Sequence, residues 1–268
     1  MKFKAEFTGE LIGTFILVFF GCSAVAVTVL YAAHVGLFQV AAIWGGGLTL
    51  AIYVTRQLSD AHFNPAVSIA MIVGKRMPLK NLPVYLIGQF SGAFLAAAVL
   101  YMVFSGSLTE YEAVNSIVRG SPESVTTAMM FGEFYPNPGA GVSFTITTMN
   151  AFLAEAAGTF LIAFFIFALT DRTNDGRPDD ALTPVFIGLT LAVIIGIIAP
   201  LTQAGLNPAR DLAPRIFAYL AGWKNAAMPD EHYGFLSVYV LGPIIGGVLA
   251  SVMYTHVVGP LMNKTKNK

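Results

Sequence analysis

Charged residues are scarce in this sequence. They make up 11% of its 268 residues, and hydrophobic residues make up 56%, whereas soluble domains carry about 25% charged residues. Lysine plus arginine and aspartate plus glutamate number 15 each, so no excess of positive charge is available to bind nucleic acid. Cysteine occurs once, at Cys22, which excludes an intrachain disulfide. The shortage of charge predicts an integral membrane protein.

Six apolar runs are long enough to cross a bilayer, which takes about 20 residues. They cover residues 8–30, 37–55, 82–105, 148–169, 183–201 and 235–258. Two shorter runs, 65–74 and 208–220, are about half a span long, and an Asn-Pro-Ala triplet marks the start of each. We therefore predict an all-α membrane protein with six transmembrane helices and two re-entrant half helices.

The distribution of positive charge predicts the orientation. If six spans are counted, most lysines and arginines, such as Lys2, Arg76 and Arg177, fall on one side together with both termini. The long connection 106–145 lies on the other side and holds Arg119 among glutamates. By the positive-inside rule both termini are cytoplasmic. We expect a multi-pass protein of the cell membrane.

The chain contains an internal repeat within a single domain. One copy covers about residues 1–110 and the other about 146–262, joined by the connection 106–145. The matched segments, in the same order in both copies, are Glu10–Phe15 with Glu155–Phe160, Gly47–Ala51 with Gly188–Ala192, Asn64–Ala66 with Asn207–Ala209, and Tyr85–Gly92 with Tyr239–Gly246. Each copy holds an odd number of spans, so the second copy enters the membrane from the opposite face. In such inverted repeats the functional site lies where the copies meet, near the membrane centre.

Each Asn-Pro-Ala triplet predicts a helix start, because proline suits the first helical turn and asparagine suits the N-cap. Asn64-Pro65-Ala66 and Asn207-Pro208-Ala209 therefore place both half-helix N-termini near the membrane centre. Irregular backbone at that depth must line protein or water. The carbonyls expected to line a path are those of Asp60, Ala61, His62, Phe63, Gln203, Gly205 and Leu206. Such a path suits water or a polyol, while the two helix dipoles oppose cations and protons.

We single out three charged residues inside the predicted membrane zone. Arg210 lies one turn into the second half helix and is the only cation that we place at this depth, which makes it a candidate functional residue. Glu10 and Glu155 occupy equivalent positions in the two copies. This symmetry favours structural carboxylates that accept backbone N–H bonds from the irregular segments, and proton coupling is the alternative. His62 is expected to be a hydrogen-bonded loop residue and not a metal ligand.

These features together resemble the major intrinsic protein (aquaporin) family over essentially the whole chain. The two Asn-Pro-Ala boxes and the Glu-x-x-Gly-Thr-Phe motif that opens each copy carry the resemblance. The run from Asn207 to Asp211 and the long third connection are similar to the glycerol facilitator (aquaglyceroporin) branch. The resemblance implies a passive channel for glycerol, other small uncharged solutes and water that excludes ions and protons. It further implies a homotetramer in the lipid bilayer, without cofactor or metal, with Asp211 in a supporting role.

The resemblance also implies a narrow filter on the extracellular side. By spacing from the boxes, its four positions fall on Trp44, Ile195, Ala204 and Arg210. Arg210 is expected to bond solute hydroxyls, and Trp44 to face the carbon backbone. The glycerol facilitator branch has a glycine where Ile195 stands and an aromatic residue where Ala204 stands, so this set is more similar to the plant nodulin-like branch. Asp60 also stands where a glycine is usual.

Other functions remain open at this point. A water-selective aquaporin, or a neutral-solute channel of nodulin-like selectivity for small organic acids, urea, ammonia or metalloid hydroxides, would use the same path. An ion-coupled secondary transporter would have to use Glu10, Glu155 or Asp60, and it lacks a basic partner in the spans beyond Arg210. A structural or junction protein would have a sealed pore, against which the intact boxes argue. An enzyme is not expected, because the four histidines are scattered and no Ser/His/Asp or Cys/His set is suggested.

Overall fold

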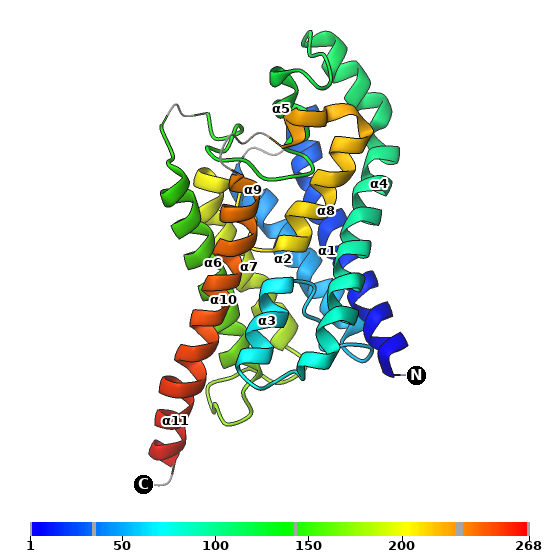
Figure 1. Ribbon diagram of the computed structural model, residues 1–268. Coiled ribbons are helices and arrows are strands. Elements are labelled where there is room, and N and C mark those ends of the chain that lie inside the picture. The colour runs from blue at the N-terminus through cyan, green and yellow to red at the C-terminus, as the bar shows by residue number, and fades with distance from the viewer. Residues whose placement is uncertain (1, 34–35, 142–143, 229–232, 267–268) are drawn as a thin grey trace.

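Helices that could cross a membrane dominate the structure, a computed structural model that describes residues 2–33, 36–141, 144–228 and 233–266 (Figure 1). Within these residues, six helical segments are long and apolar enough to span a bilayer. They are α1 (Lys2–Tyr31), α2 (Leu37–Thr55), α4 (Leu82–Val114), α6 (Thr148–Thr170), α7 (Thr183–Thr202) and the segment Gly234–Met262, which contains α9 (Gly234–Leu236), α10 (Gly242–Met253) and the start of α11 (Gly259–Lys266). The predicted six-span, all-α membrane fold is confirmed.

Two short helices, α3 (Pro65–Val73) and α8 (Pro208–Ala218), are the predicted half helices. Each has its asparagine as N-cap: the Asn64 side chain accepts the Ala66 N–H at 2.9 Å, and the Asn207 side chain accepts the Ala209 N–H at 3.1 Å. Figure 1 shows both inside the bundle. Helix α3 lies toward the end where α1 begins and α11 ends, called here the termini end, and α8 lies toward the opposite end, called the connection end.

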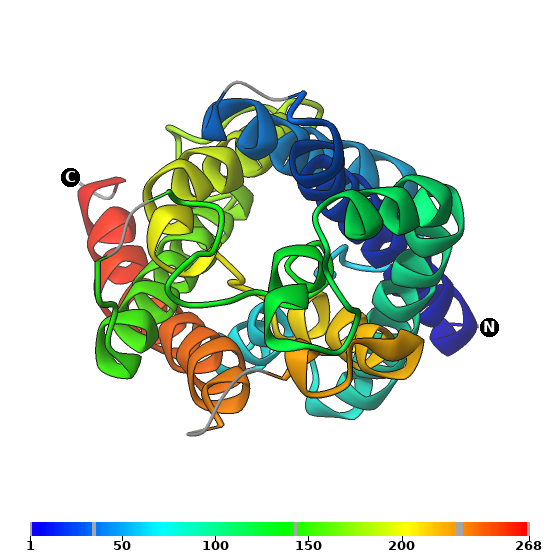
Figure 2. The same ribbon diagram turned by 90° about the horizontal axis from the view of Figure 1, so that it is seen from above.

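The two sequence copies pack in the same way. Helix α1 packs against α4 and α2, and its counterpart α6 packs against α10 and α7, while α2 and α7 meet between the copies. Seen from above, the helices form a ring (Figure 2). A Cβ atom on Gly92 would overlap the Leu11 carbonyl oxygen, and one on Gly246 would overlap the Ala156 carbonyl oxygen. Glycine at these equivalent positions therefore permits a close approach of the paired helices.

One predicted boundary was wrong. We assigned residues 106–145 to a connection, whereas α4 continues to Val114 and the short helix α5 spans Val125–Ala128. Residues 106–114 contain no proline and several good helix formers, so the helix continues after the apolar run has ended. Glu112, near the end of α4, is buried and forms a 2.8 Å ion pair with Arg119 of the following connection. Packing against its own connection thus stabilises this extension of α4.

Candidate pore

The N-termini of α3 and α8 meet inside the bundle through two crossed hydrogen bonds. Asn64 Nδ2 donates to the Leu206 carbonyl at 2.9 Å, and Asn207 Nδ2 donates to the Phe63 carbonyl at 2.7 Å. Each asparagine therefore caps its own helix with its Oδ1 atom and holds the opposite irregular segment with its Nδ2 atom. This exchange joins the two copies at the point where the repeat predicts the functional site.

Two buried carboxylates hold the irregular segments before the boxes. Glu10 accepts the backbone N–H groups of His62 at 3.0 Å and Phe63 at 2.8 Å. Glu155 accepts those of Gly205 at 2.9 Å and Leu206 at 2.6 Å. Neither glutamate is measurably exposed to solvent. The interpretation that these carboxylates bind loop N–H groups is therefore confirmed, and each of them also accepts a side-chain hydroxyl.

The held segments contain backbone conformations that side chains other than glycine rarely adopt. Ala61 and Phe63 have φ of 55° and 52°, and in the second copy Ala204 and Leu206 have φ of 62° and 54°. Such left-handed residues cost on the order of 1 kcal/mol or more each and persist only where the surroundings impose them. The N–H bonds to Glu10 and Glu155 impose them here. Strain at equivalent places in both copies marks these segments as functional candidates.

A cavity of about 820 Å³ runs past both boxes. Along α2 it is lined from Trp44 to Arg56, which corresponds to roughly 18 Å at 1.5 Å rise per residue. One part of its wall is apolar and includes Leu48, Ile187 and Leu191. The other part carries the two asparagines and the irregular segments. The cavity therefore offers an apolar surface and a hydrogen-bonding surface along one path.

The predicted site residues divide according to this cavity. Those that line it are Trp44, Ile195, Ala204, Arg210, Asn64, Asn207, Asp60, Ala61, His62, Gly205 and Leu206. Phe63 and Gln203, whose carbonyls were predicted to line the path, are not among the residues that line the cavity. The Phe63 carbonyl accepts Asn207 Nδ2, and the Gln203 side chain accepts the Phe134 N–H at 2.9 Å and donates to the Met129 carbonyl at 3.3 Å. Gln203 is therefore directed at the long connection.

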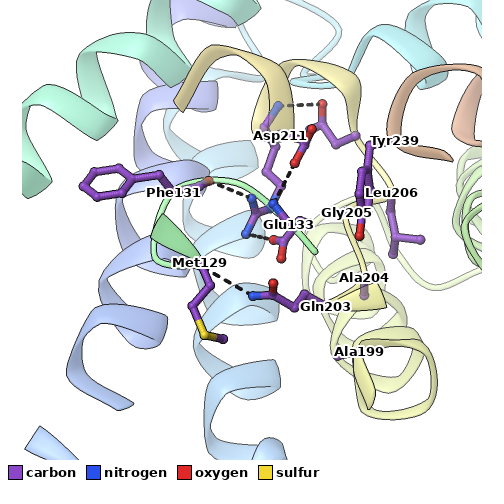
Figure 3. A network of polar contacts seen from close by, with 12 residues as sticks. Met129, Phe131, Glu133, Ala199, Gln203, Ala204, Gly205, Leu206, Asp211 and Tyr239 are labelled. Atoms are coloured by element: carbon purple, nitrogen blue, oxygen red, sulfur yellow. Dashed lines mark hydrogen bonds and ion pairs between the residues drawn. The ribbon is translucent and has the colours of Figure 1, made fainter. Parts of the chain in front are cut away.

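Arg210 lines the cavity and is held by Trp44 and by two residues of the long connection, Phe131 and Glu133, which are labelled in Figure 3. Its guanidinium carbon lies 4.4 Å from the centre of the Trp44 ring, which is within the range of a cation–π contact. Its Nη1 atom donates to the Phe131 carbonyl at 3.3 Å, and its Nη2 atom forms an ion pair with Glu133. Arg210 is only 4% exposed, and these contacts hold its guanidinium in a fixed orientation on the cavity wall.

A second buried cation, which the sequence did not place, supports this arrangement. Arg215 is 1% exposed and donates to both carboxylate oxygens of Asp211, at 2.7 and 3.1 Å, and to the carbonyls of Glu133 and Ala227. Asp211 also accepts the Glu133 N–H at 2.7 Å. Sequence analysis did not single out Arg215, whose charge is compensated within its own helix by Asp211 four residues earlier.

Sequence reasoning missed Phe131 and Glu133 as partners of Arg210. Both belong to the long connection, which was expected only to link the copies. Glu133 was counted there as one of several acidic residues on the outer side. Its sequence position gives no signal, because its partners Arg210 and Asp211 lie in the second copy and are reached only when the connection folds back over the bundle.

Comparison with known proteins places this geometry in context. The sequence pattern described as "Major intrinsic protein" matches residues 1–254. The glycerol uptake facilitator protein of Haemophilus influenzae is 38% identical over 257 residues, which cover 96% of this chain and 94% of that protein. The propanediol uptake facilitator PduF of Salmonella typhimurium is 36% identical over 257 residues, which cover 96% and 94%. The X-ray structure of the aquaglyceroporin from Plasmodium falciparum aligns with a TM-score of 0.83 at 26% identity, covering 98% of this chain and 99% of that one.

Proposed function

Because this chain belongs to the Major intrinsic protein family, we propose that it is a passive transmembrane channel for glycerol, other small uncharged solutes and water. The observation that carries the proposal is the cavity past the two boxes, with apolar residues on one part of its wall and hydrogen-bonding groups on the other. Similarity to proteins named for glycerol and propanediol uptake supports the choice of solute. The protein is a transporter of this kind and not an enzyme.

The division of the wall explains how a polyol could pass. A molecule such as glycerol has a carbon edge and a hydroxyl edge, and each finds a matching surface in the cavity. The hydrogen bonds that the solute hydroxyls made to water are replaced by hydrogen bonds to Arg210, to the asparagine amides and to the carbonyls of Ala61 and Gly205. Because Glu133 holds Arg210, and Glu10 and Glu155 hold the segments before the boxes, the solute does not have to order these groups as it enters.

Ion exclusion follows from the same elements. The N-termini of α3 and α8 face each other, so the positive ends of both helix dipoles meet in the middle of the path. Arg210 lines the same path, and its charge is paired with Glu133. A cation would have to give up its hydration shell against this potential, whereas a neutral solute does not. Protons are opposed by the same field.

We assign the filter to Trp44, Ile195, Ala204 and Arg210, all of which line the cavity. Arg210 supplies donors to solute hydroxyls, and the Trp44 ring lies against the guanidinium and faces carbon. The small Ala204 opens one side of this ring, while Ile195 fills another. This combination favours a second candidate within the channel class, a neutral-solute channel of nodulin-like selectivity, which would also pass urea or ammonia.

We further propose that the termini end is cytoplasmic and that the protein lies in the cell membrane. Lys2, Arg56, Arg76 and Arg172 belong to this end, in agreement with the positive-inside rule. Family membership supports a homotetramer in which every subunit has its own pore. The symmetric hydrogen-bond shells of Glu10 and Glu155 argue against the ion-coupled transporter, because neither carboxylate is among the residues that line the cavity.

The decisive experiment is stopped-flow light scattering on vesicles that contain the purified protein. Shrinkage after a sucrose step reports water permeability, and re-swelling after a glycerol step reports glycerol entry. Glycerol entry well above that of empty vesicles supports the proposal. Fast shrinkage without glycerol entry would leave a water-selective channel, with Ile195 as the expected obstruction. If both rates equal those of empty vesicles, the pore is sealed and the proposal is wrong.

A further inference from the structure

Asp60 places a charged side chain on the cavity wall at the termini end. The residue is exposed, lines the cavity and begins the segment that leads to Asn64. Its neighbours in that segment offer neutral backbone carbonyls as acceptors. A carboxylate accepts hydrogen bonds that are roughly twice as strong as those to neutral acceptors. Asp60 is therefore a far stronger acceptor than the rest of its segment, and nothing in the crossed-box geometry uses it.

Among the described residues, the Asp60 carboxylate is engaged on one side only. The Tyr85 hydroxyl donates to Asp60 Oδ2 at 3.2 Å, which is longer than the usual O–H···O range of about 2.5–3.0 Å. The same hydroxyl accepts the Asp60 N–H at 3.1 Å, and Tyr85 is fully buried. A carboxylate has about four acceptor positions. Tyr85 thus fixes the side chain against α4 and leaves most of its acceptor capacity directed at the cavity.

Asp60 differs from the other charged residues at the termini end of the cavity, which are either positive or paired with an opposite charge. Asp180 accepts Arg177 Nη1 at 2.5 Å, and this hydrogen bond and the charge of Arg177 hold the pKa of the Asp180 carboxyl below its ordinary value. No ion pair involves Asp60 among the residues that the structure describes. The arginines that line the same end of the cavity are Arg56, Arg76 and Arg172. Cations approaching from this end are therefore repelled, while a neutral hydroxyl donor meets no such barrier.

We propose that Asp60 forms a binding site for vicinal diols at the cytoplasmic mouth of the pore, separate from the filter around Arg210. The inference rests on the proposed function and adds a specificity-determining residue to it. Hydroxyls on neighbouring carbons can both donate to the two oxygens of one carboxylate. Hydroxyls on carbons 1 and 3 must order an additional rotatable bond to do the same, which weakens their binding. The pore then has a charged donor near one end and a charged acceptor near the other.

The test compares 1,2-propanediol with 1,3-propanediol, which have the same atoms and differ only in the spacing of their hydroxyls. Vesicle uptake of both is measured for the wild type, Asp60→Asn, which keeps the shape and removes the charge, and Asp60→Glu, which keeps the charge. Asp179→Asn is the matched control, because Asp179 is an exposed aspartate at the same end that does not line the cavity. Water permeability is recorded for every variant.

We expect Asp60→Asn to lower the ratio of 1,2- to 1,3-propanediol permeability by roughly 2- to 10-fold, the range that follows from one weakened hydrogen bond. Asp60→Glu should retain at least half of the wild-type preference, and Asp179→Asn should leave both the ratio and water permeability unchanged. An unchanged ratio in Asp60→Asn overturns the inference. An equal change for both diols and water also overturns it, because that indicates a change in pore width.

Two further outcomes separate this inference from the proposed function. If the wild type carries water but neither diol nor glycerol, the proposed solute fails and the diol site fails with it. If the diol ratio is unchanged but alkylammonium ions added on the termini side block glycerol flux in the wild type and not in Asp60→Asn, the site binds cations. That result would overturn the diol assignment while leaving the channel intact.

Discussion

Glu133, in the connection between the two copies, forms a buried ion pair with Arg210 on the cavity wall. The side chains are 1% and 5% exposed. Glu133 is itself fixed through its backbone, because its N–H is bound by Asp211 and its carbonyl by Arg215. The long connection is therefore a structural part of the proposed filter.

Replacement of Glu133 by glutamine tests this relationship. Removing one partner of a buried ion pair leaves an uncompensated charge and destabilises a protein by about 3–5 kcal/mol. We expect Glu133→Gln to lower the thermal unfolding temperature in detergent and to reduce glycerol flux, since Arg210 loses its orientation. Glu123→Gln, an exposed change in the same connection, is the control. Equal stability of the two variants would contradict the structural role of Glu133.

Arg210→Ala should loosen the proposed filter. The substitution removes a cation from the cavity wall and takes away the group that packs against Trp44. We expect four- and five-carbon polyols to enter vesicles faster than in the wild type, and small cations to leak. Because Glu133 then remains buried without a partner, the double variant with Glu133→Gln should be more stable than Arg210→Ala alone. Unchanged solute selectivity would remove Arg210 from the filter.

Ala204→Phe should narrow the ring opposite Trp44. Ala204 lines the cavity and carries only a methyl group. The phenyl group at this position is expected to slow glycerol by at least several-fold more than water, because glycerol is the wider molecule. The ratio of the two permeabilities is the measurement. If both fall by the same factor, Ala204 does not face the solute.

Glu155→Gln should weaken the irregular segment without opening a path for protons. The carboxylate accepts two backbone N–H groups and the Thr202 hydroxyl, and an amide offers only one oxygen. One N–H group left unpaired costs about 1–3 kcal/mol, which thermal unfolding will detect against the exposed control Glu110→Gln.

Glycerol uptake in wild-type vesicles should be the same with and without an imposed pH gradient. Gradient-driven accumulation would instead support a coupled transporter.

Gly246→Ala should force α10 away from α6. The added methyl group would overlap the Ala156 carbonyl oxygen, and overpacking of this kind costs about 1–3 kcal/mol. Gly106→Ala is the matched change, because nothing lies within 4 Å of a Cβ at that position. Gly106→Ala is expected to be neutral or stabilising. Similar unfolding temperatures for the two variants would contradict the close helix approach.

Sequence alone predicted the features that depend on local chemistry and on the repeat. Apolar runs of membrane length gave six spans, and the Asn-Pro pairs gave the starts of α3 and α8 with their caps. The equivalent positions of Glu10 and Glu155 indicated carboxylates that bind loop N–H groups, and both do. These predictions succeed because a bilayer forces backbone groups to be satisfied within helices or by dedicated partners, so few alternatives exist.

Only the tertiary structure decided the contacts between the long connection and the second copy. The path of the long connection, the pairing of Glu133 with Arg210 and the hydrogen bonds of the Gln203 side chain to that connection all depend on contacts between distant residues. No periodicity or motif encodes them, because buried charges are placed by whichever partners the folded chain brings within reach. The sequence determined where a pore could form, and the folded connection determined which groups hold Arg210 in place.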